Sequence, residues 1–130
     1  MSHHREIVDA SGAPPAVGPY SHAVKAGGLL FCSGQIPLDP SGGELVGDDA
    51  PAQARRCLEN LTAVCAQAGA RLADAVRITI YTTEMDAFGA INEVYAEHFE
   101  ADPPARAAVG VAALPKGARV EMDAIVALPE

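Results

Sequence analysis

Two segments that lie far apart in the chain carry the residues that could do chemistry. Residues 18–40 include Tyr20 and Ser33, and Gly34 directly follows the serine. Residues 104–106 read Pro-Ala-Arg and place Arg106 at the start of a run of small apolar residues. A guanidinium stays protonated in proteins and binds a carboxylate through two parallel hydrogen bonds. If the two segments meet in space, they form a site for a small carboxylic acid.

Arg106 and the acidic pair Glu121 and Asp123 each have a chemical and a structural interpretation. Arg106 is either an exposed arginine that pairs with a surface acid or a carboxylate anchor at a subunit or domain edge. Its apolar neighbours favour the anchor, because low polarity strengthens a hydrogen bond. Glu121 and Asp123 project from one face of a predicted strand, so they could do acid–base chemistry or form a solvated face with Arg119.

The other polar candidates give weaker signals. Tyr20 and Ser33 could orient a ligand or could be ordinary strand residues. Asn92 lies on a predicted helix, where it is either polar surface or a partner across an interface. His22 is a lone strand histidine, for which a structural role is the commoner one. The sequence contains none of the spacings typical of a nucleophilic serine, a zinc site or an HExxH metal site.

Composition and charge narrow the class of protein. The 130 residues suit one domain, residues 1–130, and with three Phe, three Tyr and no Trp the core must rely on Ala and Val. Such a core gains by burying surface against copies of itself, which favours a homo-oligomer. The net charge of −8 argues against nucleic-acid binding. The sequence shows no apolar run of the roughly 20 residues that span a bilayer and no signal peptide, so we expect a cytoplasmic protein without membrane contact.

Alternating and helical patterns predict the elements that must position these residues. The predicted order is strands, helix, strand, helix and two strands, which makes an α+β fold with both helices on one face of a mixed sheet. The pair Gly27-Gly28 predicts a hairpin turn, since both central residues of a tight hairpin turn need positive φ. Asp48 or Asp49 should cap the first helix, which opens at Pro51, and Asp86 the second. The predicted strands cover residues 5–9, 21–26, 29–33, 75–83, 105–113 and 119–127.

Several motifs, taken together and in this order, resemble the RidA family, the YjgF-type reactive intermediate deaminases. The resemblance covers roughly residues 5–127. Any one of the motifs alone would be a weak signal, whereas the set is specific. The motifs are Gly18-Pro19-Tyr20-Ser21, the run from Ser33 to Pro40, Asn92 with Tyr95, Pro104-Ala105-Arg106, and Leu114-Pro115-Lys116 followed by Val120-Glu121.

This resemblance implies a fold, an assembly and an activity. The fold is chorismate-mutase-like, and three copies form a homotrimer whose sheets make a central barrel with a cleft at each interface. The activity is hydrolysis of reactive enamines and imines, such as 2-aminoacrylate from pyridoxal-phosphate dehydratases, to a 2-keto acid and ammonia. The resemblance implies neither a metal nor an organic cofactor.

The resemblance also implies roles for individual residues. Arg106 corresponds to the arginine that binds the substrate carboxylate, and Glu121 to the glutamate that positions or activates water. The residues implied to line the pocket are Tyr20, Ser33, Gly34 and Asn92.

The chain departs from the family pattern in ways that leave alternatives open. Ala108 stands where many active members have a cysteine, Gly110 where relatives are often acidic, and His22 where glutamine is common. Ala108 keeps a non-catalytic, metabolite-binding trimer as one alternative. An endoribonuclease or translation inhibitor is another, against which the acidic charge counts. Chorismate mutase activity rests on fold analogy alone.

Overall fold

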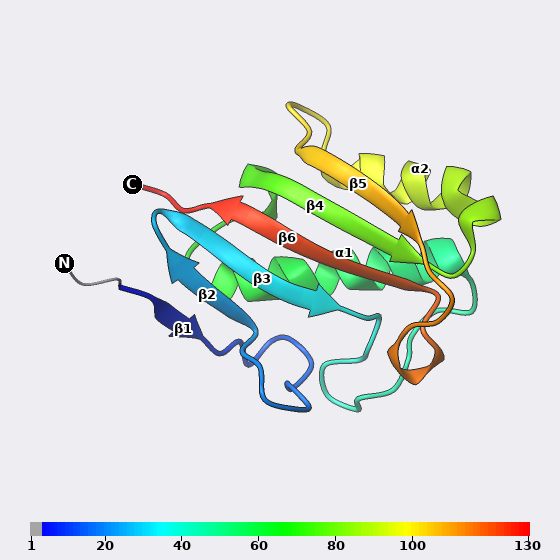
Figure 1. Cartoon of the computed structure of the whole chain (residues 1–130), viewed down its shortest axis with the longest axis horizontal. Helices are drawn as coiled ribbons and strands as arrows, with labels where there is room; N and C mark the ends of the chain where they lie inside the picture. Colours follow the sequence, from blue (N-terminus) through cyan, green and yellow to red (C-terminus); the bar gives the residue numbers. More distant parts are fainter. Residues whose placement is uncertain (1–3) are drawn as a thin grey trace.

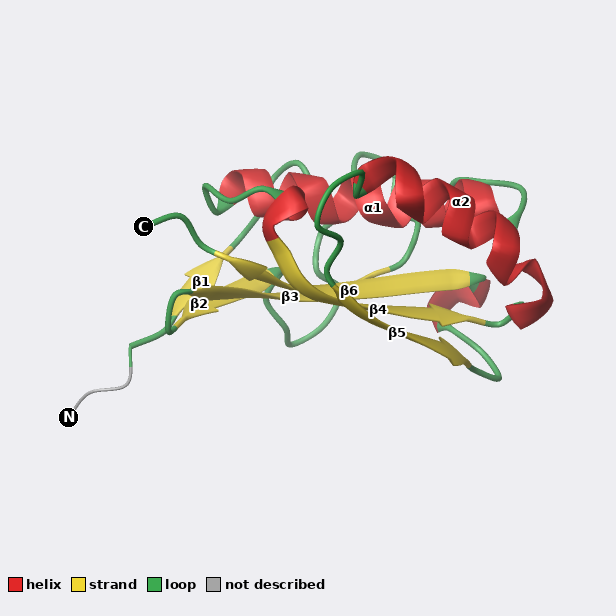
Figure 2. Ribbon diagram, turned by 90° about the horizontal axis from the view of Figure 1, so that it is seen from above, coloured by secondary structure: helices red, strands yellow, loops and turns green. Residues whose placement is uncertain are grey.

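The computed structural model describes residues 4–130 as a six-stranded mixed sheet with two α-helices on one face, which confirms the predicted α+β fold (Figures 1 and 2). Three short 3₁₀ turns, η1 (Leu72–Asp74), η2 (Met85–Ala87) and η3 (Pro115–Gly117), join the larger elements. The strands and helices are β1 (Glu6–Val8), β2 (Ala23–Ala26), β3 (Leu29–Gln35), α1 (Ala50–Gln67), β4 (Ala75–Thr82), α2 (Phe88–His98), β5 (Ala105–Gly110) and β6 (Val120–Ala127).

The strand order places β6, the last strand in the chain, inside the sheet. The order is β1-β2-β3-β6-β4-β5, with β4 and β5 parallel and every other pair antiparallel. Figure 1 shows β6 between β3 and β4, and β5 at the edge. The strand that carries Glu121 therefore lies beside the hairpin strand of Ser33, whereas the strand that carries Arg106 lies two positions away.

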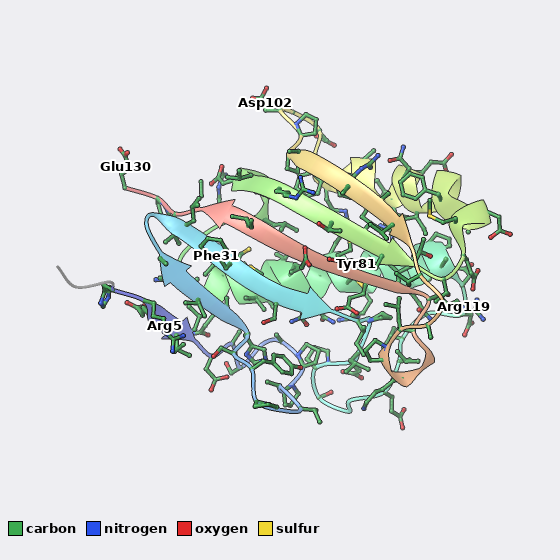
Figure 3. The ribbon with its side chains drawn as sticks, viewed as in Figure 1. Arg5, Phe31, Tyr81, Asp102, Arg119 and Glu130 are labelled. Atoms are coloured by element: carbon green, nitrogen blue, oxygen red, sulfur yellow. The ribbon has the colours of Figure 1, made fainter. Side chains whose placement is uncertain are left out.

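The two faces of the sheet differ in what covers them. Along β6 buried residues alternate with half-buried ones, and Val120 and Met122 are fully buried on the side of the helices. The opposite face carries neither α1 nor α2 (Figure 2). On that open face Phe31 of β3 and Val109 of β5 stay 43% and 40% exposed. Figure 3 looks onto this face and shows Phe31 and Tyr81 standing on it. Within residues 4–130, one side of the sheet thus has no helix to cover it.

Local sequence signals explain most of the element boundaries. The β2–β3 hairpin turns at Gly27 and Gly28, as the two glycines predict. Their φ values are 58° and 80°, both positive, as this kind of turn requires. Asp49 caps α1, because its side chain accepts a hydrogen bond of 2.9 Å from the Ala52 amide. The prediction that Asp86 caps α2 is wrong. Asp86 lies inside η2, where the Phe88 amide already bonds to the Met85 carbonyl.

The three cysteines, Cys32, Cys57 and Cys65, are free and buried between the helices and the sheet. They belong to the same core as the buried leucines and isoleucines. Among residues 4–130, no helix has the length and apolarity needed to cross a membrane.

Candidate active site

A cavity of about 550 Å³ lies where β3 and β6 run into the loops at one end of the sheet. It brings together four of the residues predicted to act on a substrate: Tyr20, Ser33, Gly34 and Glu121. Most of the other lining side chains are apolar. A small polar cluster beside an apolar wall is typical of a site for a small organic molecule. The remaining lining residues are Pro14, Pro15, Val17, Gln35, Ile36, Leu38, Pro115 and Lys116.

A β-bulge brings Ser33 and Gly34 to the cavity. Cys32 pairs with Ala124 of β6 but Gln35 pairs with Met122, so β3 carries one extra residue between these pairs. The Ser33 hydroxyl donates a 2.5 Å hydrogen bond to the Ser21 carbonyl. The hydroxyl proton is therefore engaged, and its oxygen keeps lone pairs that can accept from a ligand or water.

Glu121 lies directly against this bulge. A Cβ built on Gly34 would overlap Oε2 of Glu121 and would lie 3.1 Å from its carboxyl carbon. The carboxylate occupies the space that any larger residue at position 34 would need. The family resemblance assigns Gly34 backbone contacts with a ligand, and the structure shows that this glycine also makes room for Glu121.

The surroundings of Glu121 increase its affinity for a proton. Burial, and secondly the negative charge of Asp123, raise the pKa of the Glu121 carboxyl above its ordinary value. Asp123 lies two residues along the same face and accepts a 3.0 Å hydrogen bond from the Tyr81 hydroxyl. A half-buried carboxyl with a raised pKa is a candidate for proton transfer.

Arg119 does not neutralise this acidic pair, so the alternative of a face linked by Arg119 is wrong. Its guanidinium pairs with Glu84 at 3.2 Å and donates to the Asp48 carbonyl at 2.9 Å. Figure 3 places Arg119 at the beginning of β6, away from the middle of the strand. Within the described chain, no lysine or arginine forms an ion pair with Glu121.

Tyr20 contributes a half-exposed phenol at the mouth of the cavity. Its side chain is 50% exposed, and its hydroxyl accepts a long hydrogen bond of 3.4 Å from the Val17 amide. Gly18 has φ of 132°, a conformation that favours glycine, and its carbonyl accepts from the Tyr20 amide at 2.9 Å. This tight turn directs the ring to the cavity, where the hydroxyl can still donate to a ligand.

Arg106 is held in place by three side chains of α2. Its guanidinium donates to Oδ1 of Asn92 at 2.6 Å. The guanidinium carbon lies 4.9 Å from the ring centroid of Tyr95 and 5.3 Å from that of Phe88. Asn92 therefore bonds to Arg106 within the chain, and it is not among the residues that line the cavity. A guanidinium has five N–H donors, so several remain for a carboxylate.

Within one chain, Arg106 does not meet the cavity. In the parallel register Arg106 is opposite Ile78, a fully buried residue on the side of the helices. Glu121 is opposite Tyr81 on the open face. The two functional groups thus lie on opposite faces of the sheet, and β4 separates their strands. Ala108, which replaces the family's cysteine, follows Arg106 on the same side of β5.

Sequence reasoning missed two features of the site. The first is the aromatic platform of Arg106, although Phe88, Asn92 and Tyr95 are spaced so that they share one helix face, which is a readable signal. The second is Lys116, which lines the cavity with φ of 58° in the left-handed region. Nothing in the sequence indicates that Pro14, Pro15 and Pro115 line the cavity, because the conformation of a loop does not follow a periodic pattern.

Among residues 4–130, no group of three or more histidine, cysteine, aspartate or glutamate side chains is arranged to hold a metal ion. The polar groups of the cavity are hydroxyls, one carboxylate, one amide and one ammonium. Such a set can bind a small acid, orient water and transfer a proton.

Comparisons with known proteins show which family the chain belongs to. The family described as Endoribonuclease L-PSP matches residues 10–128. A RutC family protein of Pyrococcus horikoshii is 46% identical over 121 residues, covering 93% of this chain and 96% of that protein. The Mus musculus 2-iminobutanoate/2-iminopropanoate deaminase is 42% identical over 121 residues, covering 93% and 90%. The crystal structure of E. coli TdcF with bound serine has a TM-score of 0.88 at 38% identity, covering 95% and 99%. The chain therefore belongs to the Endoribonuclease L-PSP family, which is the RidA or YjgF family that its motifs resemble.

Proposed function

We propose that this protein hydrolyses small 2-imino acids, such as 2-iminopropanoate and its tautomer 2-aminoacrylate, to 2-keto acids and ammonia. The observation that carries the proposal is Glu121, a carboxyl with a raised pKa packed against the Gly34 bulge in a mostly apolar cavity. The name of the mouse relative supports the choice of substrate.

The reaction needs water and proton transfers but no redox step. Water adds to the carbon of the protonated imine, so that a C–O bond forms and the C=N bond becomes single. Collapse of this carbinolamine breaks the C–N bond and forms the carbonyl group. A protonated imine and water give a keto acid and ammonium, so atoms and charge balance.

Glu121 is the residue that moves the protons in this proposal. Its ionised carboxylate accepts a proton from water as the oxygen attacks the imine carbon. The protonated carboxyl then gives this proton to the nitrogen. As the C–N bond breaks and ammonia leaves, the carboxylate takes the hydroxyl proton of the carbinolamine, and ammonia finally accepts that proton to become ammonium. A raised pKa favours these roles, because the carboxyl must hold the proton before it passes the proton to the nitrogen. Ser33 and Tyr20, which line the cavity, hold the water and the imine nitrogen in this proposal.

Arg106 binds the substrate carboxylate in this proposal, and a second copy of the chain supplies it. Arg106 and Glu121 lie on opposite faces of one sheet, so a single chain cannot hold one small acid between them. The open face, with Phe31 and Val109 exposed, is not covered by a helix in the described part of the chain. A homotrimer, as the family resemblance implies, would bury this face and place the Arg106 of one copy at the cavity of the next.

Cleavage of RNA, which the family description names, has less support from the charges. Contact with several phosphates requires several basic side chains. Of the described residues that line the cavity, Lys116 is the one basic side chain, and the whole chain has a net charge of −8. A site of this size and charge fits one small acid better than a polyanion.

The decisive experiment follows the disappearance of an imine. A pyridoxal-phosphate-dependent dehydratase generates 2-aminoacrylate from serine, and the rate of pyruvate formation is measured with and without this protein. We expect the wild-type protein to accelerate the reaction. Arg106→Ala should lower kcat/KM by roughly 10²-fold, since two charge-assisted hydrogen bonds are lost.

Arg71→Ala is the matched control for this variant. Arg71 is an exposed arginine whose pairing with Asp74 lies outside the cavity, so its removal should leave kcat/KM unchanged. If the wild-type protein gives no acceleration, the proposed function is wrong and a binding role becomes the better account. If Arg106→Ala retains full activity, the role proposed for Arg106 as the carboxylate anchor is wrong.

A further inference from the structure

One wall of the cavity is a stretch of chain without regular structure. Residues 10–20, here called the wall segment, belong to no helix or strand and connect β1 to the hairpin. The segment supplies Pro14, Pro15, Val17 and Tyr20 to the cavity lining. Its first part is anchored by Ala10 and Ala13, which are 1% and 2% exposed. The part of the wall segment that lines the cavity must therefore be held by a small number of hydrogen bonds to the rest of the chain.

The hydrogen bonds from the wall segment to the rest of the described chain end on one side chain. Its other hydrogen bonds are internal, from Ala13 to Ala10, from Tyr20 to Gly18 and from Val17 to the Tyr20 hydroxyl. The two bonds that leave the segment both reach the imidazole of His22. Nδ1 lies 2.8 Å from the Ala10 amide nitrogen, and Nε2 lies 2.7 Å from the Pro14 carbonyl oxygen.

These two partners define the protonation state of the ring. A backbone amide can only donate, so Nδ1 must be an unprotonated acceptor facing Ala10. A carbonyl can only accept, so Nε2 must carry a proton facing Pro14. The ring is therefore the neutral Nε2–H tautomer. The carboxylate of Asp9, 3.2 Å from Nδ1 and 95% exposed, receives no proton from a ring in this state.

The position of His22 connects the wall segment with the bulge on the other side of the cavity. The residue is 4% exposed, so the surrounding protein fixes its ring. Its own carbonyl accepts a 2.9 Å hydrogen bond from the amide of Ser33, next to Gly34. One residue thus holds Pro14 through its side chain and Ser33 through its backbone. Loss of the ring would leave the Ala10 amide and the Pro14 carbonyl without their partners.

We propose that His22 is a positioning residue: its neutral imidazole holds the wall segment in the conformation that forms the apolar side of the cavity. The wall, made by Pro14, Pro15 and Val17, is then the subsite for the aliphatic side chain of the imino acid. His22 does not touch the reacting atoms in this scheme. The kinetic part of the inference rests on the proposed imine hydrolysis, whereas the structural part does not.

The tautomer can be tested in the wild-type protein without any substitution. In two-dimensional ¹H–¹⁵N spectra of uniformly ¹⁵N-labelled protein at pH 7, we expect the His22 ring to show one protonated and one unprotonated nitrogen, with the proton on Nε2. A proton on Nδ1, or on both nitrogens, would overturn the inference, since Ala10 would then face a second donor.

Three variants test the positioning role. His22→Phe keeps the ring volume but removes both hydrogen bonds, while His22→Gln keeps one donor and one acceptor. We expect His22→Phe to raise KM about tenfold, as the loss of a buried hydrogen bond implies, and kcat to change less. His22→Gln should recover most of this loss. Asp9→Asn is the control and should leave KM unchanged, because a neutral ring does not need the carboxylate.

Two readouts separate a positioning role from general destabilisation. Hydrogen exchange should accelerate in peptides that cover residues 10–20 of His22→Phe and stay unchanged in those from α1. The KM penalty should be larger for the imine of leucine than for that of alanine, since a longer chain reaches the wall. Unchanged exchange together with an unchanged KM would overturn the inference. If the wild-type protein hydrolyses no imine, the proposed function fails, while the exchange and the tautomer still decide the role of His22.

Discussion

At the scale of single residues, Asp123 contributes to how Glu121 responds to pH. In the proposed mechanism hydrolysis requires the ionised form of Glu121, so activity should rise with pH through the pKa of this carboxyl. Burial and the charge of Asp123 hold that pKa above its ordinary value. Asp123→Asn removes the charge but keeps a partner for the Tyr81 hydroxyl, so the pKa should fall. The acid limb of the kcat/KM profile should then move to lower pH.

The comparison variant for this experiment is Asp86→Asn. Asp86 lies in η2 outside the cavity, so its substitution should leave the profile where it is. An acid limb that moves to higher pH in Asp123→Asn, or does not move at all, would show that another group limits the rate. The profile is measured as imine disappearance from pH 5 to pH 9 with substrate well below KM.

The sequence identifies the candidate site residues, but it does not show for every one of them on which face of the sheet the side chain lies. The alternation along residues 119–127 predicts that Glu121 and Asp123 share a face, and the structure agrees. Arg106 had no such signal. Its strand consists of small apolar residues with no polar alternation, so the pattern does not distinguish the side of the helices from the open side.

At the scale of the elements, the bulge of β3 determines where the carboxylate of Glu121 lies. Gly34→Ala would place a methyl group on Oε2 of Glu121. Either the carboxylate or the bulge must move, which should lower kcat by about tenfold and the free energy of unfolding by about 1–3 kcal/mol. Thermal unfolding and the rate of imine hydrolysis measure the two effects.

Gly89→Ala provides the corresponding control in another element. Gly89 lies on α2 with no atom near an added Cβ, so alanine should stabilise the helix by roughly 0.5–1 kcal/mol without changing kcat. A Gly34→Ala protein with the activity and stability of the wild type would mean that Glu121 has free space elsewhere, and the bulge would lose its role in placing the carboxylate.

The periodic pattern of apolar residues explains why the helices and strands could be predicted. Their ends were harder to predict, because they depend on local backbone contacts that follow no period. The helical face from Leu58 to Val64 and the hairpin at Gly27-Gly28 follow from local sequence, and both are confirmed. Asp86 was predicted to cap α2, but the chain enters that helix through a 3₁₀ turn whose backbone bonds replace the cap. The bulge had no signal, because an extra residue in β3 becomes visible only against the register of β6.

At the scale of the whole molecule, the proposed assembly can be tested by mixing two impaired proteins. Arg106→Ala lacks the carboxylate anchor and Glu121→Gln lacks the base, so each variant alone should have only a small fraction of the wild-type activity. If neighbouring copies share a site, co-expression of the two variants should restore part of the activity, because some cavities then combine an intact Glu121 with an intact Arg106. Analytical ultracentrifugation of the same samples measures the number of copies.

A mixture of Arg106→Ala with the double variant Arg106→Ala/Glu121→Gln is the control, since no combination of these chains restores an arginine. Activity in this control above that of the separate variants would point to a different anchor. If the first mixture shows no such gain although mixed assemblies form, both groups must act within one chain, and the proposed sharing of the site is wrong. The sequence alone does not show that Arg106 and Glu121 lie on opposite faces of the sheet, because no sequence pattern relates the faces of two strands that are far apart in the chain.

Because Arg106 and Glu121 lie on opposite faces, a defective chain would affect the cavities of its neighbours in a mixed assembly. In an assembly with shared sites, a chain that has lost its arginine disables one cavity of a neighbour and still lends its own glutamate to an intact arginine. A cell that makes both normal and defective chains would keep activity in proportion to the intact pairs. A defect at either residue would thus disable a cavity that also contains an intact residue of a neighbouring copy, so its effect is not confined to the chain that carries it.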